Sequence, residues 1–200
     1  CVFADAFAQL DDAKFSRHFL HEKVVRHLHL PPATMAQIAN ADAIIGDQFT
    51  YIGEAHALPR DTSWKHNPSR DKEWQIAHHK FYFGVDLIQA YAATGHATYL
   101  QRWIELTASW LDEMGTGFIA ASDAQVEAKR VESWITAYVL LLKLERPKLI
   151  PAGLLRRWLG RIAEEAHYIT QNLKPSRNHR TFQLYAMFLA GVVFPEFRWA

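Results

Sequence analysis

Apolar and polar residues alternate with helical spacing over most of the chain. Apolar side chains that recur every three or four positions are typical of a helix with a buried face. Proline, glycine and capping residues divide the pattern into segments. The predicted helices cover residues 1–30, 34–43, 74–94, 96–113, 124–144, 151–173 and 178–194. Short links between long helices predict an all-α array of antiparallel hairpins, stacked as a layered toroid or solenoid.

The helical pattern breaks between Asp47 and Glu73. A short strand is predicted at residues 49–53, and a long connection that contains Trp64 and His66 follows it. Long connections without regular structure inside a compact domain are usually functional or disordered. Two tryptophans, Trp64 and Trp74, argue against disorder, so Trp64 and His66 are predicted to contact a ligand.

The last predicted helix begins with three polar residues, Asn178, His179 and Arg180, and is then almost wholly apolar up to Pro195. A helix that is apolar on all sides is expected to be buried. Its polar end is then a place where a cleft would be lined. Asn is also a favoured N-cap, and Asn178 can have both roles.

Composition bounds the function without identifying it. The 200 residues are half apolar and predict one domain, 1–200, with a substantial core. A net charge of +1 gives no basic patch for nucleic acid, and no apolar run is long enough to span a membrane. The single cysteine, Cys1, cannot form an internal disulfide. Because the chain does not begin with Met and ends just after a core helix, it is expected to be part of a longer protein.

Histidine and tryptophan are abundant, with eleven and seven residues. His78 and His79 would point about 100° apart on a helix, and neither has the i,i+4 partner of a typical metal motif. No metal or cofactor is therefore predicted. Aromatic side chains can stack on sugar rings, although most tryptophans, Trp134 among them, are expected to fill the core.

Several short motifs occur in a characteristic order along residues 49–196. They are DTSW (61–64), HNP (66–68), EW (73–74), HKFY (79–82), DL and AY (86–91), TG and Y (94–99), WLD (110–112), AKR and W (128–134), NH (178–179) and FPE (194–196). This order resembles the N-terminal toroid domain of the heparinase II/III-like polysaccharide lyases, which include alginate and heparan lyases.

The resemblance implies an incomplete (α/α) toroid followed by antiparallel β-sandwich domains of the same protein, with the active site in the groove between them. It implies β-elimination at a uronic acid in an acidic polysaccharide. The proton next to an ionised carboxylate is very weakly acidic, so the carboxylate must be hydrogen-bonded as charge develops, while a base and an acid move protons. Asn178 matches the residue that engages the carboxylate, and His179 matches the histidine beside it.

Other matched positions suggest substrate contacts. Arg130 and Trp134 occupy an Arg…Trp pair of the family pattern, which places them in the sugar groove. An arginine can bind a carboxylate bidentately. An internal ion pair of Arg130 with Glu127 or Glu132 is the alternative that the sequence leaves open.

Two parts of the family pattern are missing. The catalytic tyrosine of the family usually follows the Asn-His pair by some tens of residues, and Tyr185 lies too near and within a helix expected to be buried. The β-sandwich, which supplies another catalytic histidine, is absent. The chain alone is therefore expected to have little or no lyase activity. The resemblance to this family suggests that the protein is located in the periplasm or outside the cell.

Two other functions remain open from the sequence. One is a non-catalytic glycan-binding or assembly module on the same fold, which would bind oligosaccharides without cleaving them. The other is an (α/α)-barrel glycoside hydrolase, which needs two carboxylates across a cleft. The acidic residues in the predicted loop region are Asp47, Glu54, Asp61, Asp71 and Glu73.

Overall fold

A computed structural model describes residues 3–23, 25, 30–114, 124–144 and 149–197 of the chain. In chain order the elements are α1 (Asp5–Ala8), α2 (Asp12–Arg17), a π-helical turn η1 (His18–Glu22), α3 (Met35–Ile45), β1 (Gln48–Tyr51), β2 (Glu54–Ala57), α4 (Lys72–His79), α5 (Tyr82–Thr94), α6 (Ala97–Met114), α7 (Ala124–Leu142), α8 (Ala152–Gln171) and α9 (Arg177–Val193). The predicted all-α class is confirmed, with one small ribbon in addition.

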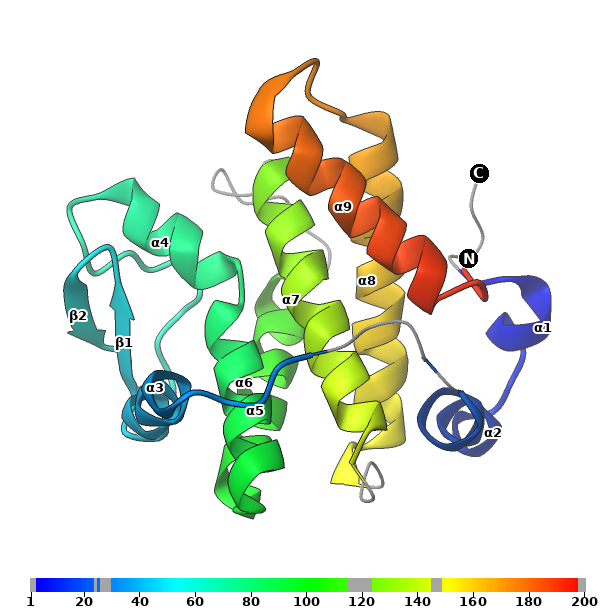
Figure 1. Cartoon of the computed structure of the whole chain (residues 1–200), viewed down its shortest axis with the longest axis horizontal. Coiled ribbons are helices and arrows are strands. Elements are labelled where there is room, and N and C mark those ends of the chain that lie inside the picture. Colours follow the sequence, from blue (N-terminus) through cyan, green and yellow to red (C-terminus); the bar gives the residue numbers. More distant parts are fainter. Residues whose placement is uncertain (1–2, 24, 26–29, 115–123, 145–148, 198–200) are drawn as a thin grey trace.

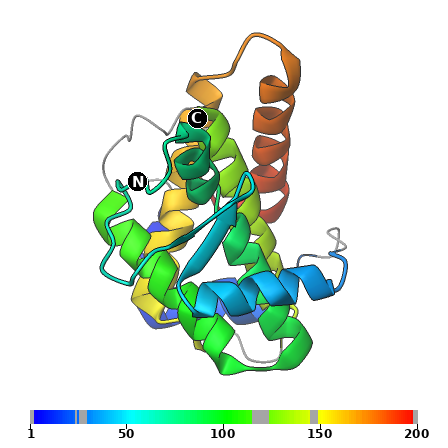
Figure 2. The same ribbon diagram turned by 90° about the vertical axis from the view of Figure 1, so that its left-hand side faces the viewer.

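The long helices form two layers. In the inner layer α3 packs on α5, α5 on α7, and α7 on α9, while α6 and α8 pack behind them (Figure 1). In the side view α6 and α9 lie on opposite sides of the molecule (Figure 2). Each outer helix returns the chain toward the same end, so α5, α7 and α9 run in the same general direction, and α7 and α9 begin at the upper end of the layer in Figure 1. This is the hairpin arrangement of an incomplete (α/α) toroid.

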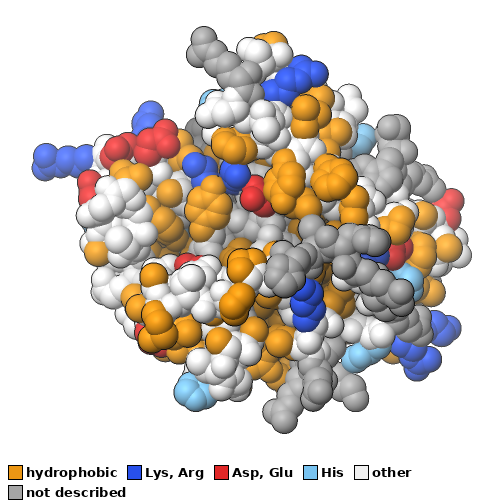
Figure 3. Space-filling model, in the orientation of Figure 1, with side chains coloured by type: hydrophobic (Ala, Val, Ile, Leu, Met, Phe, Trp, Pro, Cys, Tyr) orange, Lys and Arg blue, Asp and Glu red, His pale blue; other side chains and the backbone are white. Residues whose placement is uncertain are grey.

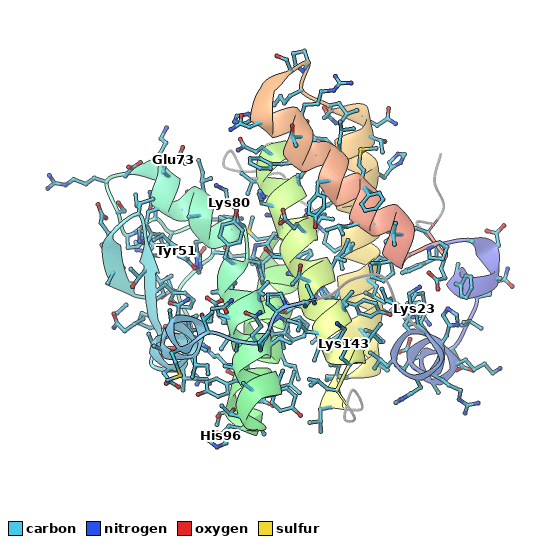
Figure 4. All side chains as sticks on the ribbon, in the orientation of Figure 1. Lys23, Tyr51, Glu73, Lys80, His96 and Lys143 are labelled. Carbon is cyan, nitrogen blue, oxygen red and sulfur yellow. The ribbon has the colours of Figure 1, made fainter. Side chains whose placement is uncertain are left out.

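The segment around α3 follows its local sequence signals. Thr34 and Gln37 form the predicted cap as a reciprocal capping box, and the helix ends at Gly46. The predicted strand is β1, which pairs antiparallel with β2 so that Phe49 lies opposite His56. Phe49 is buried, and Tyr51, labelled in Figure 4, donates or accepts a 3.1 Å hydrogen bond at Nδ1 of His78 in α4.

The N-terminal prediction of one helical segment over residues 1–30 is wrong. The described part contains two short helices and a π-helical turn. Asp11 begins a new helix because its carboxylate accepts a 2.8 Å hydrogen bond from the Lys14 amide. Lys23 then adopts an extended conformation that ends the turn. Val24 and residues 26–29 lie outside the described residues.

The predicted helix over residues 74–94 is two helices. Phe81 separates them with a left-handed backbone, φ 60°, which a bulky residue rarely adopts. Its ring is fully buried and packs edge-on against Trp110 and Trp134, so core packing offsets the backbone cost. The predicted end at Gly95 is confirmed, with φ 73°.

The last helix differs most from its prediction. It is not buried on all sides, because Phe188 is 61% exposed and lies in an exposed apolar row. The row consists of Leu184, Tyr185, Phe188 and Val192, and Figure 3 shows apolar side chains gathered in the upper centre of this face. The opposite side, with Ala186, Leu189, Ala190 and Val193, is buried, because α7 and α8 are the described helices that pack extensively against α9.

The end of α9 is tied to the beginning of the chain. Lys23 donates hydrogen bonds of 2.6 and 2.7 Å to the two carboxylate oxygens of Glu196, and His18 lies 2.9 Å from the same group (Figure 4). Phe3 and Phe197 form a backbone bridge. These contacts fix the C-terminal end of α9 and leave its N-terminal end to be fixed by other residues. No helix in the described ranges is long and apolar enough to cross a bilayer.

Candidate functional site

Asn178 and His179 lie in the first turn of α9, at the end of the layer where α7 also begins (Figure 1). Ser176 is the N-cap residue, so the prediction that Asn178 caps the helix is wrong. Asn178 is exposed and His179 is half-buried. Neither side chain hydrogen-bonds to another residue within the described part of the chain. Their polar atoms are therefore available to a ligand.

The connection before α9 is held by a buried amide. The side chain of Gln183 accepts a 2.8 Å hydrogen bond from the Lys174 amide and donates one of 3.0 Å to the Asn172 carbonyl. Arg180 donates to the carbonyls of Lys174 and Pro175 at 3.2 and 3.3 Å. Both side chains belong to the first two turns of α9. They therefore fix the backbone at the point where Asn178 is presented.

The same end of the molecule favours negative charge. The N-terminus of a helix carries a partial positive charge and free backbone N–H groups. The first residues of α7 and α9 both lie at this end, since the two helices begin on the same side of the layer (Figure 1). An anionic group near Asn178 would therefore meet a favourable field before any charged side chain is considered.

A lysine from the neighbouring helix lies on the same side of α9. The ammonium of Lys129 in α7 is 3.9 Å from the ring centroid of Phe182 and 2.8 Å from Oε2 of Glu132. Phe182 follows Asn178 by four residues, so the two share one face of the helix. The structure thus places an amide, an aromatic ring and an ammonium on one side of α9, a grouping that the sequence did not show.

A cavity of about 310 Å³ lies lower on the inner layer, between α3, α5 and α7. It is lined by Gln37, Tyr82, Val85, Asp86, Glu132, Ser133 and Thr136. The hydroxyls of Ser133 and Thr136 donate to backbone carbonyls of their own helix at 2.9 and 2.8 Å. Their free lone pairs and the two carboxylates therefore present hydrogen-bond acceptors, which suit the hydroxyl donors of a sugar.

Electrostatics in this cavity follow from burial. Burial raises the pKa of Asp86, and hydrogen bonds from Asn40 and Gln37 oppose that shift. Burial and the nearby Glu132 carboxylate raise the pKa of Tyr82, so its hydroxyl keeps its proton at neutral pH. This cavity was not predicted from the sequence. Its only signal was the polar residues at helical spacing, Glu132, Ser133 and Thr136, within an otherwise apolar helix.

Trp64 and His66 share a second cavity of about 200 Å³ between the ribbon, the long connection and α6. Trp64 is only 5% exposed and stacks on His78 with ring centroids 4.7 Å apart. His66 is exposed at the same cavity. None of the lining residues belongs to α7, α8 or α9. These two predicted contacts therefore lie near each other but apart from Asn178.

Arg130 and Trp134 are core residues, 0% and 1% exposed. The Arg130 guanidinium donates to both oxygens of Glu165 at 2.8–3.0 Å and to the His79 carbonyl at 3.0 Å. The internal ion pair that the sequence allowed is thus present, but its partner is Glu165 rather than Glu127 or Glu132. The partner comes from α8, 35 residues away. A sugar does not reach either side chain in this structure.

His79 is held neutral beside this ion pair. The Trp110 indole donates a 3.1 Å hydrogen bond to His79 Nδ1, so the ring carries its proton on Nε2 and donates it to the Trp64 carbonyl at 3.0 Å. Burial and then Arg130 lower the pKa of His79 to about 4. Burial also holds the pKa of His78 well below its usual value. No group of three or more potential metal ligands occurs among the described residues.

Comparisons with known proteins agree with this architecture. Residues 16–200 match the family model described as Heparinase II/III N-terminus. A heparin-sulfate lyase of Pedobacter heparinus is 28% identical over 146 residues, which are 70% of this chain and 21% of the relative. The heparan sulfate lyase HepC of the same organism superposes with a TM-score of 0.77 at 20% identity, covering 92% of this chain and 31% of that structure.

A crystal structure of heparinase III superposes with a TM-score of 0.78 at 17% identity, covering 94% of this chain and 31% of that one. These low identities show a shared fold. The chain spans between a fifth and a third of the length of these relatives. The resemblance and the toroid fold expected from the sequence are both confirmed.

Proposed function

The chain belongs to the heparinase II/III N-terminal family, and on that premise we propose that it is the N-terminal toroid portion of a polysaccharide lyase. The lyase would cleave a uronic-acid-containing polysaccharide by β-elimination. The observation that carries the proposal within this family is the free amide of Asn178, exposed in the first turn of α9. His179 would contact the sugar beside it.

The chemistry requires a donor at the carboxylate. When the neighbouring C–H proton leaves, negative charge moves onto the carboxylate oxygens as an enediolate. The Asn178 amide offers two N–H donors that do not titrate, and the N-terminus of α9 adds its partial positive charge. Donors placed where charge develops are usually the largest single contribution to such a reaction.

The base and the acid are assigned to other parts of a longer protein. Tyr185 is exposed on α9, contrary to its predicted burial, but it follows Asn178 by seven residues. That spacing is about 10 Å along the helix axis. The proton to be removed lies on the carbon bonded to the carboxylate. A hydroxyl that far from the carboxylate contact does not reach that proton.

The hydrolase alternative finds less support in the loop acids. Asp47 accepts a hydrogen bond from Arg102, Glu54 lies 3.1 Å from His56, and Asp71 caps α4. These three carboxylates already have structural partners. The cavity lined by acceptors on the inner layer suits a sugar in a lyase and in a binding module alike, so the reaction product must distinguish them.

The test is the ultraviolet absorbance of the unsaturated uronate that β-elimination creates. This chain and a version that continues past residue 200 would each be incubated with a panel of uronate polymers. We expect absorbance from the longer protein and little or none from the chain alone. New reducing ends without absorbance would show a hydrolase. Saturable binding without either product would show a glycan-binding module.

A further inference from the structure

The environment of Lys129 is unusual for a lysine at a helix surface. Its side chain is 16% exposed, and that of its partner Glu132 is 28% exposed. The ammonium lies between the Glu132 carboxylate at 2.8 Å and the face of Phe182 at 3.9 Å. A cation within about 6 Å of a ring centroid is attracted to the ring. Two elements, α7 and α9, therefore hold this charge in place.

The position of Phe182 relates the charge to Asn178. Both residues belong to α9, four positions apart, and therefore lie one above the other on the same face. Side chains in a helix lean toward its N-terminus, so the Phe182 ring points toward the turn that carries Asn178. An ammonium held over that ring is therefore on the side of α9 that carries Asn178.

The ion pair leaves the ammonium open to exchange. The Lys129 ammonium has three N–H donors, and Glu132 accepts a hydrogen bond through one of its oxygens. A partly exposed ion pair contributes little to stability. A substrate carboxylate can therefore replace Glu132 on Lys129 at small cost, while Phe182 keeps the ammonium in position.

We propose that Lys129 is a second recognition residue for the acidic sugar, binding the same carboxylate that Asn178 engages, with Glu132 as an internal competitor for its ammonium. The inference rests on the proposed function only in taking the first turn of α9 as the carboxylate site. The two donors differ in kind, since the lysine supplies a full positive charge and the asparagine supplies oriented N–H groups. Together they distinguish a uronate from a neutral sugar.

The experiment is titration calorimetry of this chain with an unsulfated tetrasaccharide of alternating glucuronate and N-acetylglucosamine, in which the carboxylates are the only anions. Lys129→Gln is expected to weaken binding about tenfold, the value of one charge-assisted hydrogen bond. Lys129→Arg is expected to keep most of the affinity. Glu132→Gln is expected to tighten binding, because it removes the competitor.

The opposite changes in affinity expected for Lys129→Gln and Glu132→Gln distinguish a role in recognition from a structural role. Both Gln variants break the same ion pair, so a purely structural pair predicts that both change affinity in the same direction or not at all. Lys14→Gln on α2 and Glu164→Gln on α8 are matched exposed controls outside the groove, each from an i,i+3 ion pair. Thermal unfolding of each variant shows whether it remains folded.

A carboxyl-reduced form of the tetrasaccharide completes the design. It is expected to bind wild type and Lys129→Gln equally, since Lys129 then has no anion to select. Equal affinity of these two proteins for the acidic form, or no binding by any of the proteins at millimolar ligand, would overturn the assignment. If a longer protein cleaves uronate polymer but Lys129→Gln binds the tetrasaccharide as tightly as wild type, the role of Lys129 is wrong and the proposed lyase function stands. If wild type binds the acidic tetrasaccharide more tightly than Lys129→Gln but the longer protein cleaves no polymer, the proposed lyase function is wrong and the role of Lys129 in recognition stands.

Discussion

Replacing Asn178 by alanine in the longer protein is expected to lower kcat by at least about a hundredfold, which is the usual effect of removing one donor to a developing oxyanion. The substituted side chain is exposed and makes no hydrogen bond to the described part of the chain, so folding should be unaffected. The measurement is the initial rate of unsaturated uronate formation at saturating polymer.

A control for this variant is Gln171→Ala, which removes another exposed amide at the end of α8, six residues before α9 begins in the sequence. Its turnover should equal that of wild type. Asn178→Asp should be at least as impaired as Asn178→Ala, because a second carboxylate repels the first. Unchanged turnover in Asn178→Ala would show that the amide has no part in the reaction.

Replacing Glu165 by methionine is expected to destabilise the fold by about 3–5 kcal/mol, because it leaves a buried arginine without its counterion. Arg130 is completely buried, and Glu165 is its only carboxylate partner among the described residues. Arg130→Met should cost less, since Glu165 keeps a 2.9 Å contact with Arg161. Urea unfolding of this chain measures both values.

The double variant Arg130→Met, Glu165→Met makes the prediction specific. Removing both charges leaves neither one unpaired, so the double variant should be more stable than Glu165→Met alone. If the two single effects instead add, the ion pair is not the reason for either loss.

Local signals in the sequence predicted local structure. The cap at Thr34, where the predicted segment 34–43 begins, and the left-handed turn at Gly95, just after the predicted segment 74–94, depend on residues within a few positions of each other, and both are found in the structure. Two failures arose from packing between distant segments. Phe81 interrupts a helical pattern because its ring is held in the core, and the exposed row on α9 depends on which helices pack against it. Periodicity contains neither kind of information.

The candidate site was only partly predictable for the same reason. Asn178 and His179 were identified by resemblance to a family, and the sequence alone suggested Asn178 for the N-cap position that Ser176 in fact occupies. Lys129 and Phe182 are 53 positions apart, so no motif joins them. The partner of Arg130, Glu165, lies on the next helix, 35 residues away, so it is not among the acidic residues close to Arg130 in the sequence.

The central claim is that an acidic sugar binds at the first turn of α9, beside Asn178. Mapping amide chemical shifts of this chain during titration with the unsulfated uronate tetrasaccharide tests that claim most directly. The account predicts the largest changes in the first turn of α9 and around Lys129. Changes confined to the cavity of Trp64 and His66, with α9 unaffected, would contradict it and place the sugar on the other side of the fold.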